Sequence, residues 1–158
     1  MSKATSHIPP GLHSLGVHLG VKGAAAYIDF LKNVFDAVEI NRAPGPGVKL
    51  MHVQMKIGDS MIMFADDFCE EFGMPPLVQG NLPVAITAYV PDVDATWAKA
   101  LAAGCTVRVP LTDQFWGDRY GQLYDPWGFT WALGTHKEDL TPAEIGERQA
   151  KAFGGGKP

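Results

Sequence analysis

The sequence contains few cysteines, no cluster of basic residues and no long apolar run. Its two cysteines, Cys69 and Cys105, are too few for a disulfide framework and lack the spacing of metal ligands. Acidic residues outnumber basic ones by 17 to 13, and the resulting net charge of −4 argues against nucleic acid and anionic membranes as partners. No segment approaches the ~18 apolar residues of a membrane span, and the first residues lack the apolar core of a secretion signal. We therefore expect no membrane partner and a cytoplasmic location.

The sequence does contain an internal duplication of its hydrophobic pattern, at an offset of 69 residues. Residues 16–21 and 85–90 are both alternating apolar segments that lead into a helix-like stretch, and residues 62–64 correspond in the same way to 131–133. Two units indicate a duplicated module rather than a solenoid, which needs at least three. Two half-open sheets side by side form a cup, and a cup is suited to holding a small molecule.

Each module is predicted to contain a strand, a helix and then three strands. In the first module, residues 14–65, period-two alternation predicts a strand over 14–21, with Leu15 facing the helices, and an apolar stripe at helical spacing follows. The second module, residues 84–136, repeats this order after an acidic linker at 66–83. A capping sequence then predicts a final helix over 141–153.

Together these elements predict a single α+β domain over residues 1–158. Two tandem βαβββ modules form a cup-shaped mixed sheet, helices cover its convex face, and a short C-terminal helix follows. Half-open sheets leave strand edges that soluble proteins normally cover, and an isologous dimer is a common way to do so. We therefore also expect a homodimer.

A family resemblance is carried by the segment FWGDRYGQLYDPWGFTWALGTH at 115–136, by the KEDL that follows it, and by GAAA at 23–26, KLMH at 49–52 and GDSMIM at 58–63. The chain resembles the vicinal oxygen chelate superfamily, which includes glyoxalase I, extradiol dioxygenases and bleomycin-resistance proteins. Within it, the chain closely resembles the PhnB-like branch, sometimes labelled demethylubiquinone methyltransferase-like. A methyltransferase is disfavoured, because the sequence shows no glycine-rich nucleotide-binding turn on a parallel sheet.

The resemblance implies a metal site whose usual ligands this chain lacks. Members that do chemistry typically hold one divalent metal with a His or Gln on the first strand and a Glu on the last strand of each module. Those positions are occupied here by Gly16, Met63, Ala85 and Ala132. Zinc, magnesium, manganese and iron sites need imidazole or carboxylate donors, which these residues do not supply. The sequence therefore predicts a metal-independent protein with no cofactor.

Strand parity predicts which side chains line the cup. Positions in phase with residues 16, 63, 85 and 132 point inward, and Trp116, Arg119 and Tyr120 are expected at the mouth. Arg119 is available for a carboxylate or phosphate, or for an ion pair with Asp118, Asp125 or a second subunit. The register of residues 119–124 stays open, because the 69-residue offset would turn Gln122 toward the helices unless a bulge intervenes. The predicted ligand-binding residues are His18, His52, Gln54, Met63, Thr87, Tyr89, Trp116, Arg119 and Thr130.

The sequence favours a small-molecule-binding protein and leaves open whether it catalyses a reaction. His18 and His52 are the imidazoles expected at the pocket, either as hydrogen-bonded lining residues or as catalytic candidates. One alternative is therefore a lyase, isomerase or oxygenase that uses these histidines as a base or as metal ligands. The other is an antibiotic-sequestering protein of the bleomycin-binding type, in which aromatic and acidic side chains hold a cationic drug.

Overall fold

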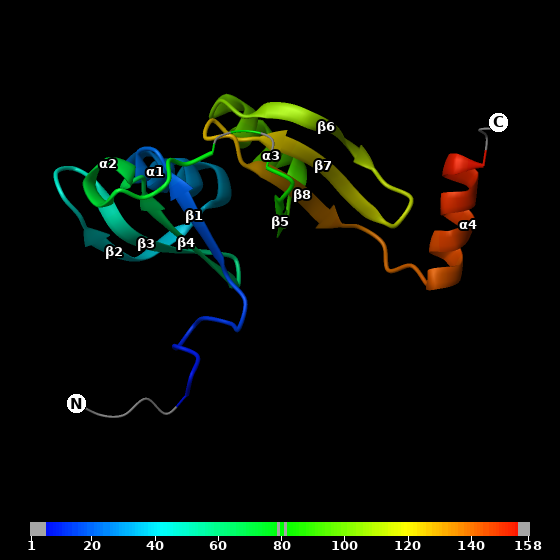
Figure 1. Ribbon diagram of the computed structural model, residues 1–158. Coiled ribbons are helices and arrows are strands. Elements are labelled where there is room, and N and C mark those ends of the chain that lie inside the picture. The colour runs from blue at the N-terminus through cyan, green and yellow to red at the C-terminus, as the bar shows by residue number, and fades with distance from the viewer. Residues whose placement is uncertain (1–5, 79, 81, 155–158) are drawn as a thin grey trace. The chain divides into compact units, whose positions relative to one another are not determined.

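The computed structural model describes residues 6–78, 80 and 82–154. The chain divides into two compact units, the first ending at Val78; we call residues 6–78 unit 1 and the described residues from 80 to 154 unit 2. Each unit contains one four-stranded mixed sheet, with strand order β1-β4-β3-β2 in unit 1 and β5-β8-β7-β6 in unit 2 (Figure 1). In each sheet the first and last strands of the unit pair in parallel, and the other pairs are antiparallel. The predicted α+β fold of two βαβββ modules is thus confirmed.

Unit 1 packs one face of its sheet against a single amphipathic helix. Its elements are β1 (Val17–Val21), α1 (Ala24–Phe35), β2 (Val38–Pro44), β3 (Leu50–Ile57), β4 (Ser60–Asp66) and the short α2 (Cys69–Phe72). The helical spacing of Tyr27, Ile28 and Leu31 puts all three on one stripe, where they are completely buried. The ring of Tyr27 meets that of Phe64 edge to face at 5.1 Å between centroids. The core of unit 1 therefore lies between α1 and this face.

A single carboxylate fastens the start of α1 to the sheet. Gly23 precedes the helix and has no side chain with which to cap it. Instead, Oδ1 of Asp66 at the end of β4 accepts hydrogen bonds from the N–H groups of Gly23 and Ala24, both at 2.9 Å. Oδ2 accepts from the N–H of Leu50 on β3 at 2.8 Å. The first helical N–H groups are thus satisfied from another strand, as helix starts require.

Unit 2 repeats this plan and adds a terminal helix. Its elements are β5 (Ala85–Tyr89), α3 (Val93–Ala102), β6 (Thr106–Asp113), β7 (Asp118–Tyr124), β8 (Thr130–His136) and α4 (Pro142–Phe153). The helix α3 approaches β7 so closely that a Cβ at Gly121 would lie 2.7 Å from the ring of Trp97. Leu123, Trp131 and Leu133 are buried in the core of unit 2.

The terminal helix α4 begins as the sequence predicts. The side chain of Thr141 accepts from the N–H of Glu144, and the Glu144 carboxylate accepts from the N–H of Thr141, which completes a capping box with Pro142 at the first helical position. None of the residues of α4 is buried. Its last residue, Phe153, meets Phe115 edge to face at 5.6 Å. Within the described ranges, no helix has the length and apolar character needed to cross a membrane.

The start of the first strand differs from the sequence prediction. β1 begins at Val17 rather than at residue 14, and Leu15, expected to face the helices, is 90% exposed. The physical reason is that a strand needs a partner for its backbone groups. The neighbour of β1 is β4, and their pairing starts at Val17 opposite Ile62. Alternation alone therefore extended the predicted strand beyond its hydrogen-bonded part.

The two units differ by one residue between their inner hairpins. Met63 of β4 pairs with Gln54 of β3, whereas Ala132, 69 residues after Met63, pairs with Gln122, only 68 residues after Gln54. Pairing between β7 and β8 shows no register shift, so the extra residue lies in the turn at 125–129. A longer turn, rather than a bulge between these strands, settles the register that the sequence left open. It keeps Gln122 on the same face as Ala132.

Candidate functional site

The sheet face of unit 1 that is turned away from α1, which we call open face 1, brings two histidines together. In the strand register His18 lies beside Met63, which in turn lies beside Gln54. His52 is two residues before Gln54 on β3 and therefore shares its face. The rings of His18 and His52 are 6.0 Å apart between centroids. His18 is exposed and the other three side chains are half-buried, so this face can contact a molecule from outside.

The corresponding face of unit 2, turned away from α3, is richer in phenols and is called open face 2. Thr87 of β5 pairs with Ala132, and Tyr89 pairs with Gly134. A side chain at Gly134 would lie 3.3 Å from the ring of Tyr89, so glycine leaves the room that this ring occupies. Thr130 lies on the same face but is buried. Across β8, the face continues onto β7 with Tyr120, Gln122 and Tyr124.

A buried carboxylate, Asp118, organises the edge of open face 2. Only 3% exposed, it accepts hydrogen bonds from the Tyr89 hydroxyl at 2.7 Å and the Trp116 indole Nε1 at 2.9 Å. Nδ1 of His136 lies 2.7 Å from its other oxygen, and Nε2 of His136 lies 3.0 Å from Asp139. Buried charges are retained only when they are paired and hydrogen-bonded in this way. The arrangement holds Tyr89 and Trp116 in fixed orientations.

This cluster shifts the ionisation of its members in a consistent direction. Burial alone would raise the pKa of Asp118, but hydrogen bonds from His136, Tyr89 and Trp116 outweigh it and lower that pKa below its ordinary value. Hydrogen bonds to Asp118 and Asp139 raise the pKa of His136. The hydrogen bond to Asp118 also raises the pKa of Tyr89, so its phenol stays protonated as a donor. The shifts thus favour a protonated His136 beside an ionised Asp118, with the neutral phenol of Tyr89 next to them.

Arg119 makes ion pairs within unit 2. Its guanidinium donates to both carboxylate oxygens of Asp94, at 2.7 and 2.8 Å, and to Asp113 at 3.2 Å. The pairing is with these two residues rather than with Asp118 or Asp125 as the sequence suggested. Asp94 lies on α3, 25 residues away in the chain, which is why its proximity could not be read from sequence neighbours. Hydrogen bonds to Asp94 and Asp113 raise the pKa of Arg119 above its ordinary value and occupy most of its N–H donors.

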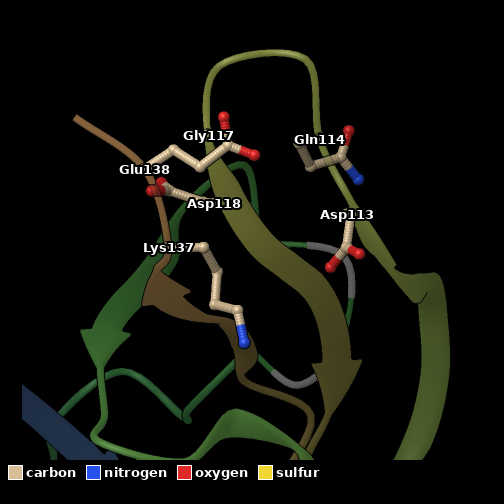
Figure 2. Close-up of a pocket in the computed structure, with 6 residues that line it drawn as sticks. All are labelled: Asp113, Gln114, Gly117, Asp118, Lys137 and Glu138. Atoms are coloured by element: carbon tan, nitrogen blue, oxygen red, sulfur yellow. The ribbon is translucent and has the colours of Figure 1, made fainter. Parts of the chain in front are cut away.

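A small pocket opens beside this cluster, at the start of β7 and the segment after β8 (Figure 2). Gly117 shapes it: its φ is +98°, and a Cβ there would lie 2.5 Å from the carbonyl oxygen of Glu138. The backbone N–H groups of Lys137 and Glu138 both donate to the carbonyl of Gly117. The pocket is lined by Asp113, Gln114, Gly117, Asp118, Lys137 and Glu138. With three carboxylates against one amine, its lining is predominantly acidic.

Sequence reasoning missed two features of open face 2. Asp118 and His136 lie within the quoted motif, but nothing in the motif indicated that they form a pair. Arg108 on β6 was not singled out at all, and its guanidinium reaches Tyr124 and Gln122 on this face.

Among the described residues, no group of three or more His, Cys, Asp or Glu side chains is arranged to hold a metal ion.

Known proteins resemble this chain in sequence or in fold. The uncharacterized protein Rv0887c of Mycobacterium tuberculosis (strain ATCC 25618 / H37Rv) is 44% identical over 135 residues, which cover 84% of this chain and 79% of that protein. TioX from Micromonospora sp. ML1 matches 78% of this chain and 99% of its own with a TM-score of 0.58 and 23% identity. A PhnB protein from Bacillus cereus, described as a putative 3-demethylubiquinone-9 3-methyltransferase, matches 78% of this chain and 99% of its own with a TM-score of 0.59 and 18% identity.

At these identities the two solved structures show likeness of fold alone. The sequence also matches a protein family directly. The matched segment, residues 11–133, includes most of both units. The duplicated βαβββ units and the quoted motif had indicated the same family. The chain belongs to the Glyoxalase/Bleomycin resistance protein/Dioxygenase superfamily.

Proposed function

We propose that this protein binds a small organic molecule on its open faces without the help of a divalent metal. The observation that carries the proposal is the combination of polar and aromatic side chains on both open faces with the loss of metal-binding side chains at the four positions the superfamily uses. Ligand sites generally combine apolar and aromatic contact area with a few placed polar groups. Open faces 1 and 2 offer both.

The residues at the four superfamily positions do not fit a divalent metal. Gly16, Ala85 and Ala132 carry no donor atom, and Met63 offers only a thioether. A soft thioether does not replace the carboxylate or imidazole that zinc, magnesium, manganese or iron(II) sites use. In the register, Met63 lies between His18 and Gln54, and Ala132 between Thr87 and Gln122. We therefore derive no step through a metal.

Preorganised side chains support binding as the role of open face 2. Tyr89 and Trp116 are held by Asp118, and Nε2 of Gln122 donates to the hydroxyl of Tyr120 at 2.6 Å. Trp116 and Tyr120 meet edge to face at 5.6 Å. Aromatic groups fixed before binding lose less conformational freedom when a ligand arrives, which favours affinity.

Methionine methyl groups give a direct test of binding on open face 1. Protein labelled with 13C at its methionine methyls, and treated with chelator, is screened by NMR against a small-molecule library. Met61 and Met63 are half-buried reporters on open face 1, Met55 is buried in the core, and Met74 is exposed outside the sheet. We expect bound compounds to shift the Met63 signal saturably while Met74 stays unchanged. On open face 2, the matching reporter is the indole signal of Trp116.

Two results would count against the proposal. The first is a library in which no compound shifts either reporter although the chelator-treated protein remains folded. The second is binding that disappears with chelator and returns with added zinc or manganese. His18→Ala and His52→Ala serve as affinity variants, because both side chains lie on open face 1 and neither is in the core. For a compound that shifts Met63, these variants should weaken binding without altering the core signal of Met55.

A further inference from the structure

Arg108 differs from the other arginines of this acidic chain because no carboxylate pairs with it among the residues that the structure describes. Arg42 pairs with Glu39, Arg119 with Asp94 and Asp113, and Arg148 with Glu138. These three guanidinium groups are therefore neutralised locally, as surface arginines near acidic residues usually are. Arg108 makes its hydrogen bonds to neutral side chains instead. Its positive charge is left available to a ligand.

A β-bulge aims this side chain at open face 2. Between Val107 and Val109, β6 advances two residues while the paired β7 advances one, from Leu123 to Gln122. Arg108 is the extra residue, and bulges characteristically redirect a side chain. Unit 1 has the same bulge on β2, between Glu39 and Asn41, where the extra residue is Ile40. The duplicated units therefore share the bulge but present arginine from only one of them.

Around Arg108, each neighbouring side-chain oxygen already accepts one hydrogen bond, while several donors have no acceptor among the described residues. Nε of Arg108 donates to the Tyr124 hydroxyl oxygen at 3.0 Å, and Nη1 donates to the amide oxygen of Gln122. The amide nitrogen of Gln122 donates in turn to the hydroxyl oxygen of Tyr120. These contacts use the oxygen atoms of all three partners. The hydrogens of both phenols and the remaining guanidinium N–H groups have no acceptor among the described residues.

We propose that Arg108, with Tyr120 and Tyr124, forms an oxyanion-binding subsite that selects small molecules carrying a carboxylate or phosphate group. The inference rests on the proposed binding function and specifies its ligand class. A guanidinium offers a planar set of N–H donors that matches two oxygens of a carboxylate or phosphate. Gln122 and Tyr124 fix the orientation of that plane. The Arg108 guanidinium also lies over the Tyr124 ring, 5.9 Å from its centroid, and this contact helps to hold it in place.

Arginine side-chain NMR tests this subsite directly, because the chain has only four arginines and each Nε–Hε signal can be assigned by mutation. The 15N-labelled protein is titrated with benzoate, with phenyl phosphate, and with benzamide as the neutral analogue of benzoate. We expect benzoate, phenyl phosphate or both to shift the Arg108 signal saturably, and benzamide not to. Whichever anion binds more tightly identifies the preferred group. Arg108→Gln should weaken that binding at least about tenfold, as losing a charged hydrogen-bond partner predicts.

Arg148→Gln is the matched control, since it removes the same charge from the same unit at an arginine already paired with Glu138. It should leave both anion affinities unchanged. Equal weakening in Arg108→Gln and Arg148→Gln, equal binding of benzamide, or no saturable shift up to roughly 20 mM would each overturn the subsite. If the anions fail while the methionine and tryptophan reporters still detect neutral ligands, the anion preference is wrong and the proposed binding function stands. If no compound shifts any of these signals, the anion subsite and the proposed binding function are both wrong.

Discussion

At the scale of single residues, Asp118 shows how one buried charge fixes several functional groups. Its Oδ2 accepts from Tyr89 and Trp116, and its Oδ1 lies within hydrogen-bond distance of Nδ1 of His136. Hydrogen bonds to a charged group contribute about 1.5 to 3 kcal/mol each. Three of them offset the burial of the Asp118 carboxylate, which explains why it remains inside unit 2. It also links the orientation of Tyr89 to the protonation of His136.

The pairing of His136 with Asp118 predicts a pH-dependent contribution to stability. The pKa of His136 is higher in the folded chain than its ordinary value, so its contribution is fully present below that ordinary value and is lost as pH rises through the folded pKa. Urea unfolding of the wild type and of His136→Gln from about pH 5 to about pH 9 measures it. The stability difference should be largest at the acidic end and shrink toward the alkaline end.

A difference that is constant across this pH range would show that His136 contributes by packing rather than by charge. The range stops near pH 5 because Asp118 acts in the opposite direction. Its pKa is lowered by folding, so its contribution is present above its ordinary value and is lost only as pH falls through the folded pKa. Asp139→Asn is a useful control, since Asp139 contacts the other nitrogen of the ring and is fully exposed. It should preserve most of the effect.

At the scale of elements, the contact between α3 and β7 depends on a residue with no side chain. A Cβ at Gly121 would lie 2.7 Å from the Trp97 ring and 2.9 Å from the Cα of Leu111. Because one of these neighbours is backbone, Gly121→Ala should destabilise unit 2 by about 1 to 3 kcal/mol, as overpacked cores do. The measurement is the urea midpoint.

Gly146→Ala is the matched control for Gly121→Ala. Gly146 lies inside α4, where nothing surrounds a Cβ within 4 Å. The same substitution there should stabilise the helix by roughly 0.5 to 1 kcal/mol, because alanine has the higher helix propensity. Similar effects of both variants would mean that α3 does not pack on β7 in the described way.

The two faces of each sheet should respond oppositely to truncation. Phe64 and Trp131 are buried on the helix-facing sides, so Phe64→Ala or Trp131→Ala should cost about 3 to 5 kcal/mol by deleting core volume. His18→Ala and His52→Ala should leave the denaturation midpoint nearly unchanged. Histidine variants that unfold as readily as the aromatic ones would invert the face assignment.

Strand parity could be read from the sequence wherever regular pairing continues, and it fails where pairing is irregular. The inward phase of His52 and Gln54 follows from alternation alone, and the structure places both on open face 1. The extra residue in the turn at 125–129 shifts the second unit by one, which a fixed offset could not predict. The bulge at Arg108 carries no periodic signal either. The hydrophobic pattern therefore did not predict that its side chain lies on open face 2.

Long-range pairings were likewise beyond the sequence. Arg119 forms an ion pair with Asp94, which lies on a helix 25 residues earlier in the chain. Tyr89 donates a hydrogen bond to Asp118, 29 residues later. The first pair depends on how α3 packs on β7, and the second on β5 and β7 lying on either side of β8. Sequence spacing gives no measure of either arrangement. By contrast, the capping box of α4 is local, with its partners three residues apart, and the sequence predicted it correctly.

At the scale of the whole molecule, the duplicated units share a fold while their open faces have diverged. His18 of β1 corresponds to Thr87 of β5, and the bulge residue Ile40 corresponds to Arg108. Unit 1 thus offers imidazoles and thioethers, and unit 2 offers phenols and a guanidinium. The two open faces should therefore favour ligands of different chemistry.

The homodimer expected from the open sheet edges stays a prediction. The exposed apolar side chains of β6, Val107 and Val109, lie on an edge strand of the unit 2 sheet, and such edges are commonly covered by a partner. Light scattering at micromolar concentration should therefore give twice the mass of one chain. A particle of single-chain mass at that concentration would contradict the prediction.

Ligand binding with and without metal tests the central claim most directly. The metal content of the purified protein is measured, and the affinity of a compound found in the methionine or tryptophan screen is then determined before and after treatment with chelator. Because Gly16, Met63, Ala85 and Ala132 supply no carboxylate or imidazole, we predict much less than one equivalent of zinc, manganese, iron or nickel and an unchanged affinity. One equivalent of metal that binds through His18 or His52, with affinity lost on chelation and restored by that metal, would contradict the account.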